Sequence, residues 1–251
     1  MGIIDILMHQ GKQYIPDLSK PVLPEIYRGL PHLSTKACGE GCNACVDICP
    51  TDAIVHTQGV SLDLGKCVFC GECQSECPDQ KIKFTNDYKI ATNERKRLVI
   101  AEGMTEGVKL DPEKVRAEIK QFFGGSLKLR QVSAGGDNAD ENELNACSNV
   151  NFDMGRYGID WVASPRHADG MVISGPITEH MAEPVQICYD AIPFPKIIIL
   201  AGTNAISGGI FEGAKSLNRS FLDKYPIDLY VPGYPPHPLT FINGVLEMIR
   251  K

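Results

Sequence analysis

The 251-residue sequence lacks three features that would assign it to common functional classes. It has no excess of basic residues, since its formal net charge is −6, so no nucleic-acid partner is predicted. It has no long apolar run: the opening MGIIDILMHQ is interrupted by Asp5 and His9 and is too short to span a membrane. It has no G-x-G-x-x-G or G-x4-G-K-[ST] motif, which argues against a glycine-rich nucleotide site.

The opening segment also lacks the marks of a targeting sequence. It has no basic n-region and no cleavage site, and Ile6 stands where a myristoylation signal requires Ser or Thr. We therefore expect a cytoplasmic protein, in which thiols stay reduced. A disulfide framework is disfavoured for the same reason.

What the sequence does have is cysteine, concentrated in two groups that each end in Cys-Pro. The second group has the spacing C-x2-C-x2-C-x3-C-P of bacterial ferredoxins that carry two 4Fe–4S clusters. The first group differs by one extra residue in its opening gap. The first group is Cys38, Cys42, Cys45 and Cys49, and the second is Cys67, Cys70, Cys73 and Cys77.

These spacings predict two 4Fe–4S clusters with exchanged ligands. In two-cluster ferredoxins the last cysteine of each group binds the other cluster. Structural zinc is disfavoured, because zinc sites pair two C-x2-C motifs across a longer gap. The predicted ligand sets are Cys38, Cys42, Cys45 and Cys77 for one cluster, and Cys67, Cys70, Cys73 and Cys49 for the other.

The chain divides into four parts by composition and pattern. Residues 1–35 form a proline-rich N-terminal arm, 36–98 a two-cluster ferredoxin domain, 99–126 a helical connector and 127–251 an α/β domain. Residues 53–62 predict a β-hairpin with Gly59 at its turn, and a strand follows at 81–84. The connector helix should begin at Asp111-Pro112 and end at Gly124-Gly125.

Residues 127–251 predict a parallel sheet. Short apolar runs alternate with helices, which indicates the flavodoxin-like arrangement with functional loops at the carboxyl ends of the strands. Pro184 should kink or shorten the helix that contains it. The expected fold is thus an α+β ferredoxin-like two-cluster domain followed by an α/β flavodoxin-like domain. The predicted strands are 127–132, 159–163, 170–174, 196–201 and 227–231, and the predicted helices are 178–191 and 238–251.

Specific stretches resemble two subunits of known complexes. Residues 27–31 (YRGLP), both Cys-Pro groups and residues 83–88 (KFTNDY) resemble the two-cluster ferredoxin subunit of respiratory complex I and of membrane-bound NiFe hydrogenases, over residues 15–98. Four later stretches resemble the small subunit of energy-converting NiFe hydrogenases, such as formate hydrogenlyase, and its complex I counterpart, over residues 127–251. The chain therefore resembles a fusion of both subunits. The later stretches are residues 129–132, 164–178, 202–211 and 231–238.

The small-subunit resemblance carries one departure. That family holds a proximal 4Fe–4S cluster with four cysteines, and the matching positions here are Asp137, Asp140, Asn204 and Tyr234. Because carboxylate, amide and phenol groups suit hard ions rather than iron–sulfur cores, we expect no third cluster. A hard cation at Asp137, Asp140 and Asn204 is an alternative to simple solvation of these acids.

The same resemblance marks three further residues. Glu143 matches a glutamate suspected of relaying protons, with a plain surface acid as the alternative. Arg166 and His167 match residues beside the proximal cluster, and here they are expected to hold the loop or to contact the large subunit. Cys147 and Cys188 are expected to serve packing, as free cysteines commonly do.

The resemblance implies an iron–sulfur electron-transfer subunit of a membrane-associated oxidoreductase, with a C-terminal domain that serves docking. Expected partners are a large subunit of hydrogenase or complex I type, membrane-arm subunits, and soluble ferredoxin or a formate or CO dehydrogenase as electron donor. They would hold the chain at the inner face of the cell membrane, and no stand-alone catalysis is expected. A scaffold subunit in a complex without hydrogen chemistry is the alternative. A free-standing ferredoxin with an added domain is less favoured, since the arm suggests permanent assembly.

Overall fold

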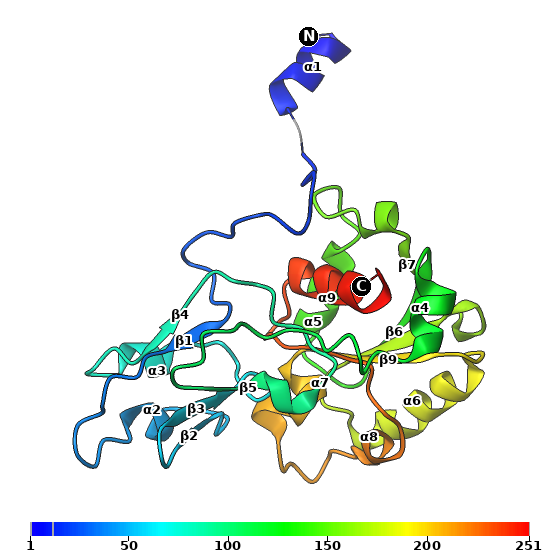
Figure 1. Ribbon diagram of the computed structural model, residues 1–251. Helices are drawn as coiled ribbons and strands as arrows, with labels where there is room; N and C mark the ends of the chain where they lie inside the picture. Colours follow the sequence, from blue (N-terminus) through cyan, green and yellow to red (C-terminus); the bar gives the residue numbers. More distant parts are fainter. Residues whose placement is uncertain (1, 12, 251) are drawn as a thin grey trace.

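The computed structural model describes residues 2–11 and 13–250, and it joins two unlike parts side by side (Figure 1). The front part contains the cysteine groups in short helices and small antiparallel sheets. Its elements are α1 (Ile3–Gln10), β1 (Pro31–Leu33), α2 (Ala44–Asp47), β2 (Ile54–His56), β3 (Val60–Asp63), α3 (Glu72–Ser75), β4 (Ile82–Phe84), the 3-10 turn η1 (Arg95–Leu98) and β5 (Val99–Ala101).

The front part has two antiparallel sheets. Strands β2 and β3 form the predicted hairpin, with Ile54 opposite Leu62. Strand β5 adds a third strand to this hairpin, although it lies in the stretch expected to be a helical connector. The predicted strand β4 pairs with β1 of the arm rather than with the hairpin. Helix α2 of the first cysteine group packs against β2, and α3 of the second packs against β4, so each group lies beside one of the two sheets.

The rear part is built on a five-stranded sheet in which all the strands are parallel. Its order is β10-β9-β8-β6-β7, so the chain starts inside the sheet, steps to one edge and returns past its starting strand. This is the flavodoxin-like order, and the predicted parallel sheet is confirmed. The elements are α4 (Ala117–Phe123), β6 (Leu127–Ser133), α5 (Ala139–Ala146), η2 (Met154–Tyr157), β7 (Ile159–Trp161), η3 (Pro165–His167), β8 (Gly170–Ser174), α6 (Glu179–Ala191), β9 (Ile197–Ala201), α7 (Thr203–Ser207), η4 (Gly209–Phe211), α8 (Ser220–Lys224), β10 (Leu229–Val231) and α9 (Pro238–Arg250).

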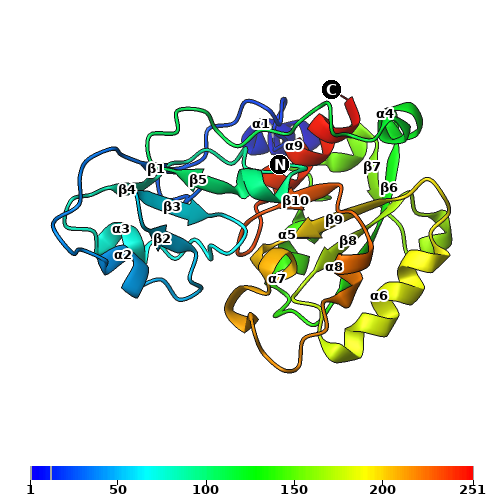
Figure 2. The same cartoon turned by 60° about the horizontal axis from the view of Figure 1, so that its bottom comes forward.

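Helices cover both faces of this sheet (Figure 2). One face packs under α4, α5 and α9, with Phe241 and Val245 fully buried. The other face packs under α6 and α8, with Val185 and Phe221 buried. The apolar core of the second face continues into the front part, so the two parts share one body of buried side chains.

One local prediction was wrong. Helix α4 begins at Ala117 instead of Asp111, because Asp111 binds Arg97 at 2.8 Å and turns the chain through its bond to the Glu113 N–H. Arg116 Nε lies 2.8 Å from Asp228 Oδ1. The backbone of Arg116 is extended just before the helix. Pro184 does not shorten α6, which runs through it from Glu179 to Ala191.

The N-terminal arm runs over both parts. Leu18 is buried, and its carbonyl accepts hydrogen bonds from the Tyr88 hydroxyl of the front part and the Asn243 amide of α9. Helix α1 projects from the body with none of its residues buried (Figure 1). Of the helices described, none has both the length and the apolar character needed to cross a bilayer.

Candidate functional site

The first predicted ligand set gathers around the loop before α2. Cys38 and Cys42 lie in this loop, Cys45 lies on α2, and Cys77 reaches them from the turn after α3. Burial raises the pKa of the Cys45 thiol, and the charges of Cys77, Cys38 and Cys42 raise it further. Such repulsion acts between neighbours. The structure thus brings Cys77 of the second group to three cysteines of the first.

The second predicted set gathers at α3. Burial raises the pKa of the Cys73 thiol to about 12, and the charges of Cys70 and Cys49 add to this effect. Burial also raises the pKa of the Cys67 thiol, where Cys73, Cys49 and Cys70 act in the same direction. Helices α2 and α3 pack against each other, so the two cysteine groups lie side by side.

Backbone N–H groups point at sulfur in both sets. The Ala53 N–H donates to Cys49 Sγ at 3.3 Å, and the Lys81 N–H donates to Cys77 Sγ at 3.2 Å. In each group the donor lies four residues after the cysteine, because the Cys-Pro turn folds the chain back over the sulfur. Such N–H donors stabilise negative sulfur and tune the potential of a bound cluster.

The donor chemistry fits an iron–sulfur core better than a single ion. Thiols with raised pKa values stay protonated unless a positive metal core displaces the proton. Four sulfurs on one zinc ion would lie within about 4 Å of one another. Among the described residues, no three Cys, His, Asp or Glu side chains are arranged to hold one metal ion. Thiolates that each bind a different iron of a cluster stand farther apart.

The second set surrounds a small cavity of about 10 Å³. Apolar side chains complete its wall, which keeps water from the sulfurs and thereby affects the potential of a bound cluster. The cysteines that line it are Cys49, Cys67, Cys70 and Cys73, and the apolar residues include Ile54, Leu62 and Phe84.

Each set has a positive side chain beside it. Lys81 is 3% exposed, and its Nζ lies 2.8 Å from Glu102 Oε2. The hydrogen bond to Glu102 is the main cause that raises the pKa of Lys81, and the charges of Cys38 and Cys77 raise it further. Arg28 donates to the carbonyl oxygens of Phe69 and Cys70, both at 2.7 Å. A fixed cation favours the reduced, more negative state of a neighbouring cluster.

The Cys67 set adjoins the rear part. Thr203, at the start of α7, donates from Oγ1 to the Cys67 carbonyl oxygen at 2.7 Å and is fully buried. Lys66 Nζ lies 2.8 Å from Glu212 Oε2 across the same junction. Gly65 has no room for a side chain here, since a Cβ would lie 2.8 Å from Ile206. This close fit holds the Cys67 set against the carboxyl edge of the parallel sheet.

The four positions marked by the small-subunit resemblance meet at that edge. The Tyr234 hydroxyl donates to Asp137 Oδ2 at 3.3 Å. Burial and the charge of Asp137 raise the pKa of Tyr234, whereas the nearby Asn204 amide lowers it. Asp137 is exposed, Asp140 is 2% exposed and Asn204 is fully buried. The Asn204 amide nitrogen and oxygen have no hydrogen bond of good geometry.

The other marked residues are dispersed. Glu143 on α5 is half-buried, and burial raises its pKa. The charge of Glu143 in turn raises the pKa values of Cys147 and of Tyr27 in the arm. Arg166 and His167 are exposed on η3, which packs against α6 and β6. Cys147 is fully buried and Cys188 is half-buried within α6. The structure therefore does not gather Glu143, Arg166 and His167 into one site.

One residue of the edge was missed by sequence reasoning. Glu141 is 6% exposed, and its Oε1 accepts a 2.8 Å hydrogen bond from Ser174. The acidic run 137–143 indicated a solvated loop, yet α5 begins at Ala139 and turns Asp140, Glu141 and Leu144 inward. The spacing of Asp140 and Leu144, four residues apart on one helix face, was the available signal.

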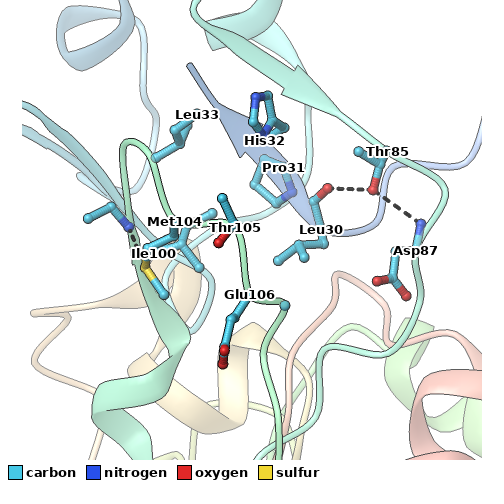
Figure 3. Close-up of a pocket in the computed structure, with 12 residues that line it drawn as sticks. Leu30, Pro31, His32, Leu33, Thr85, Asp87, Ile100, Met104, Thr105 and Glu106 are labelled. Atoms are coloured by element: carbon cyan, nitrogen blue, oxygen red, sulfur yellow. Dashed lines mark hydrogen bonds between the residues drawn. The ribbon is translucent and has the colours of Figure 1, made fainter. Parts of the chain in front are cut away.

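A separate open groove of about 430 Å³ runs between β1, β5 and the loop after β5 (Figure 3). The Thr85 hydroxyl donates to the Leu30 carbonyl at its rim, and Asp87 and Glu106 also line it. No cysteine lies in its wall, so the groove is distinct from the thiol sets.

The family profile of the NADH ubiquinone oxidoreductase 20 kDa subunit matches residues 138–248, which lie in the rear part. The probable membrane-bound hydrogenase subunit mbhJ of Pyrococcus furiosus is 34% identical over 139 residues, which are 55% of this chain and 83% of that protein. The chain belongs to this family. The eight clustered cysteines lie outside the residues that the profile matches.

Other proteins are similar over shorter stretches. An NADH-quinone oxidoreductase subunit of Clostridium beijerinckii is 39% identical and covers 43% of this chain and 65% of its own length. An F(420)H(2) dehydrogenase subunit of Methanosarcina mazei is also 39% identical, over 43% of this chain and 59% of that protein. A chain of the archaeal membrane-bound sulfane sulfur reductase matches 51% of this chain and 72% of its own length, with 30% identity and a TM-score of 0.44.

Proposed function

We propose that this chain is an electron-transfer subunit of a membrane-bound oxidoreductase and carries two 4Fe–4S clusters. The single observation that carries the proposal is the gathering of the eight cysteines into two sets of four, each completed by the last cysteine of the other group. Family membership of the rear part, whose relatives are subunits of hydrogenase, F(420)H(2) dehydrogenase and NADH-quinone oxidoreductase complexes, supports the setting.

The chain's own groups supply binding, orientation and shielding. Bound 4Fe–4S clusters would accept and donate single electrons. The eight thiolates would hold them, and the N–H groups of Ala53 and Lys81 would orient the two exchanged sulfurs. Lys81 and Arg28 would offset the negative charge of the reduced state, and the apolar wall of the Cys67 set would exclude water.

The rear part serves docking in this proposal. Its four marked positions offer two carboxyls, an amide and a phenol, which are poor ligands for an iron–sulfur core. The proposed partners are a large subunit of hydrogenase or complex I type and the membrane-arm subunits, with soluble ferredoxin or a formate or CO dehydrogenase as donor. They would hold the chain peripherally at the inner face of the membrane.

Metal analysis tests the proposal directly. Anaerobically purified full-length chain should contain about eight irons and eight acid-labile sulfides, with EPR signals from two interacting clusters after dithionite reduction. About four irons would reject the second cluster. About twelve would reject the assignment of Asp137, Asp140, Asn204 and Tyr234 as a site without a cluster.

A scaffold role without electron transfer is the second candidate, favoured by the absence of sulfur at those four positions. The two roles separate in the isolated complex. If the clusters of this chain are reoxidised by the complex's own acceptor at the rate of turnover, the chain conducts electrons. If they stay reduced while the complex turns over, the scaffold role holds.

A further inference from the structure

Two adjacent carboxylates are buried at the carboxyl edge of the parallel sheet. Asp140 and Glu141, in the first turn of α5, are 2% and 6% exposed. Asp140 lies against Gly202, where a Cβ would come within 2.4 Å of Asp140 Oδ2. Glu141 accepts its hydrogen bond from Ser174 at the end of β8. Loops after β6, β8 and β9 therefore enclose the pair, at the point where the strand order reverses.

Each carboxyl of the pair has one neutral hydrogen-bond partner, the Gly175 backbone for Asp140 and Ser174 for Glu141, and neither has a cation in the described part of the chain. Asp140 Oδ2 and Glu141 Oε2 are buried without a hydrogen-bond partner, and within residues 2–11 and 13–250 no cation forms an ion pair with either. The titratable groups that face Asp140 are Glu141, Asp137 and the Tyr234 phenol, all neutral or negative. A buried, unpaired carboxylate is relieved by binding a proton or a cation.

The arrangement favours a proton over a metal ion. Calcium and magnesium take six or more oxygen ligands, counting water, around one point. Over the described part of the chain, no cluster of three acidic or thiol side chains has the geometry for one ion. A proton needs a single carboxylate oxygen. Burial, followed by the charges of Glu141 and Asp137, raises the pKa of Asp140 to about 7, so such a proton would exchange near neutral pH.

We propose that Asp140 and Glu141 form a proton-binding site that takes up one proton when an electron enters the adjacent Cys67 set. This linkage between proton uptake and electron entry rests on the proposed function of the Cys67 set. Asp140 touches Gly202, and the next residue, Thr203, holds the Cys67 carbonyl at 2.7 Å. An electron from the donor makes this region more negative, which favours uptake of one proton from water, and departure of the electron releases it.

Tyr234 and Asp137 lie between this pair and solvent. Asp137 is exposed, and the Tyr234 hydroxyl donates to it at 3.3 Å. The charge of Asp140 acts on the same phenol, so Tyr234 faces both the exposed and the buried acid. In this proposal the proton reaches Asp140 by way of Asp137 and Tyr234.

Infrared difference spectroscopy of the full-length chain between pH 6 and pH 8 tests the site itself. The wild type should show a protonated-carboxyl C=O band that titrates near pH 7. Asp140→Asn should abolish it, and Asp137→Asn, at the exposed acid, should retain it with a midpoint at lower pH, because the charge of Asp137 raises the Asp140 pKa. Glu141→Gln should move the midpoint to lower pH, because the charge of Glu141 raises the Asp140 pKa. Absence of the band in the wild type, or its loss on adding sodium chloride in place of choline chloride, would overturn the proton site.

EPR-monitored redox titration at pH 6 and pH 8 tests the linkage. One of the two cluster signals should move to lower potential as the pH rises, by up to about 59 mV per pH unit, a tenfold change for one electron. Asp140→Asn should remove this slope and leave the second cluster unaffected. A slope that persists in Asp140→Asn would overturn the linkage. A chain that holds no clusters would overturn the proposed function and the linkage, while the infrared band still decides the proton site.

Discussion

The thiol sets of the front part and the carboxyl edge of the rear part have a similar arrangement of side chains but different chemical groups. Each brings four side chains from separate segments to one place. The front part uses thiols, which as thiolates suit a positive, soft core. The rear part uses oxygen and nitrogen groups, and the one buried acid among them, Asp140, has no cation partner among the described residues. The comparison teaches that a fold can keep the convergence of a site while its ligand type changes what the site binds.

Removing one buried thiol should have the largest effect. Cys73→Ser should lower iron from about eight to about four per chain and remove one EPR signal, because a hydroxyl is a poor ligand for the core. Cys49→Ser should remove the same signal, and Cys77→Ser the other. Cys188→Ser, a matched change of a cysteine outside both sets, should leave iron unchanged. Loss of the same signal in Cys49→Ser and Cys77→Ser would contradict the exchanged ligand sets.

Adding thiols to the rear part should give it the cluster-binding capacity proposed for the front part. The quadruple variant Asp137→Cys, Asp140→Cys, Asn204→Cys and Tyr234→Cys should raise iron to about twelve per chain after anaerobic reconstitution, since the backbone already brings these positions together. The triple variant that keeps Tyr234 is the control and should gain less iron. Iron that stays at eight in the quadruple variant would show that the edge has lost more than its sulfur.

The buried acid should make stability depend on pH. The pKa of Asp140 is raised to about 7 from an ordinary 3.8, so the folded chain binds more protons than the unfolded chain between these values. Stability therefore falls as the pH rises through this window, and Asp140 contributes a loss of about 2 kcal/mol between pH 5.5 and pH 7. Urea unfolding at pH 5.5 and pH 8 should show this loss in the wild type relative to Asp140→Asn. Equal pH dependence in both proteins would contradict it.

The junction between the two regions should give the smallest effect. Thr203→Val removes the hydroxyl that binds the Cys67 carbonyl and should cost about 1 kcal/mol of unfolding free energy. Thr105→Val, at an exposed threonine in the groove, should cost almost nothing. Denaturant titration of both variants measures the difference. Equal stability would show that the junction does not depend on this bond.

Periodic apolar patterns made much of the fold predictable. The runs at 170–174 and 196–201 are buried on both faces, so their lack of alternation indicated parallel strands, and the observed bounds differ by one residue at most. Short or contact-dependent elements escaped prediction. Strand β5 forms only because β3 offers an edge to pair with, and α4 starts late because Arg97 and Asp228 engage residues 111 and 116.

The sequence by itself determined where sulfur is abundant and where it is absent, because cysteine spacing is a local property of the chain. It also determined the parallel sheet, since burial on both faces leaves a local pattern of apolar residues. Only the tertiary structure decided that Thr203 joins the Cys67 loop to the sheet edge and that Asp140 and Glu141 lie buried there without a cation. Burial and pairing of a charge depend on segments distant in sequence, and these meet only when the two parts pack together.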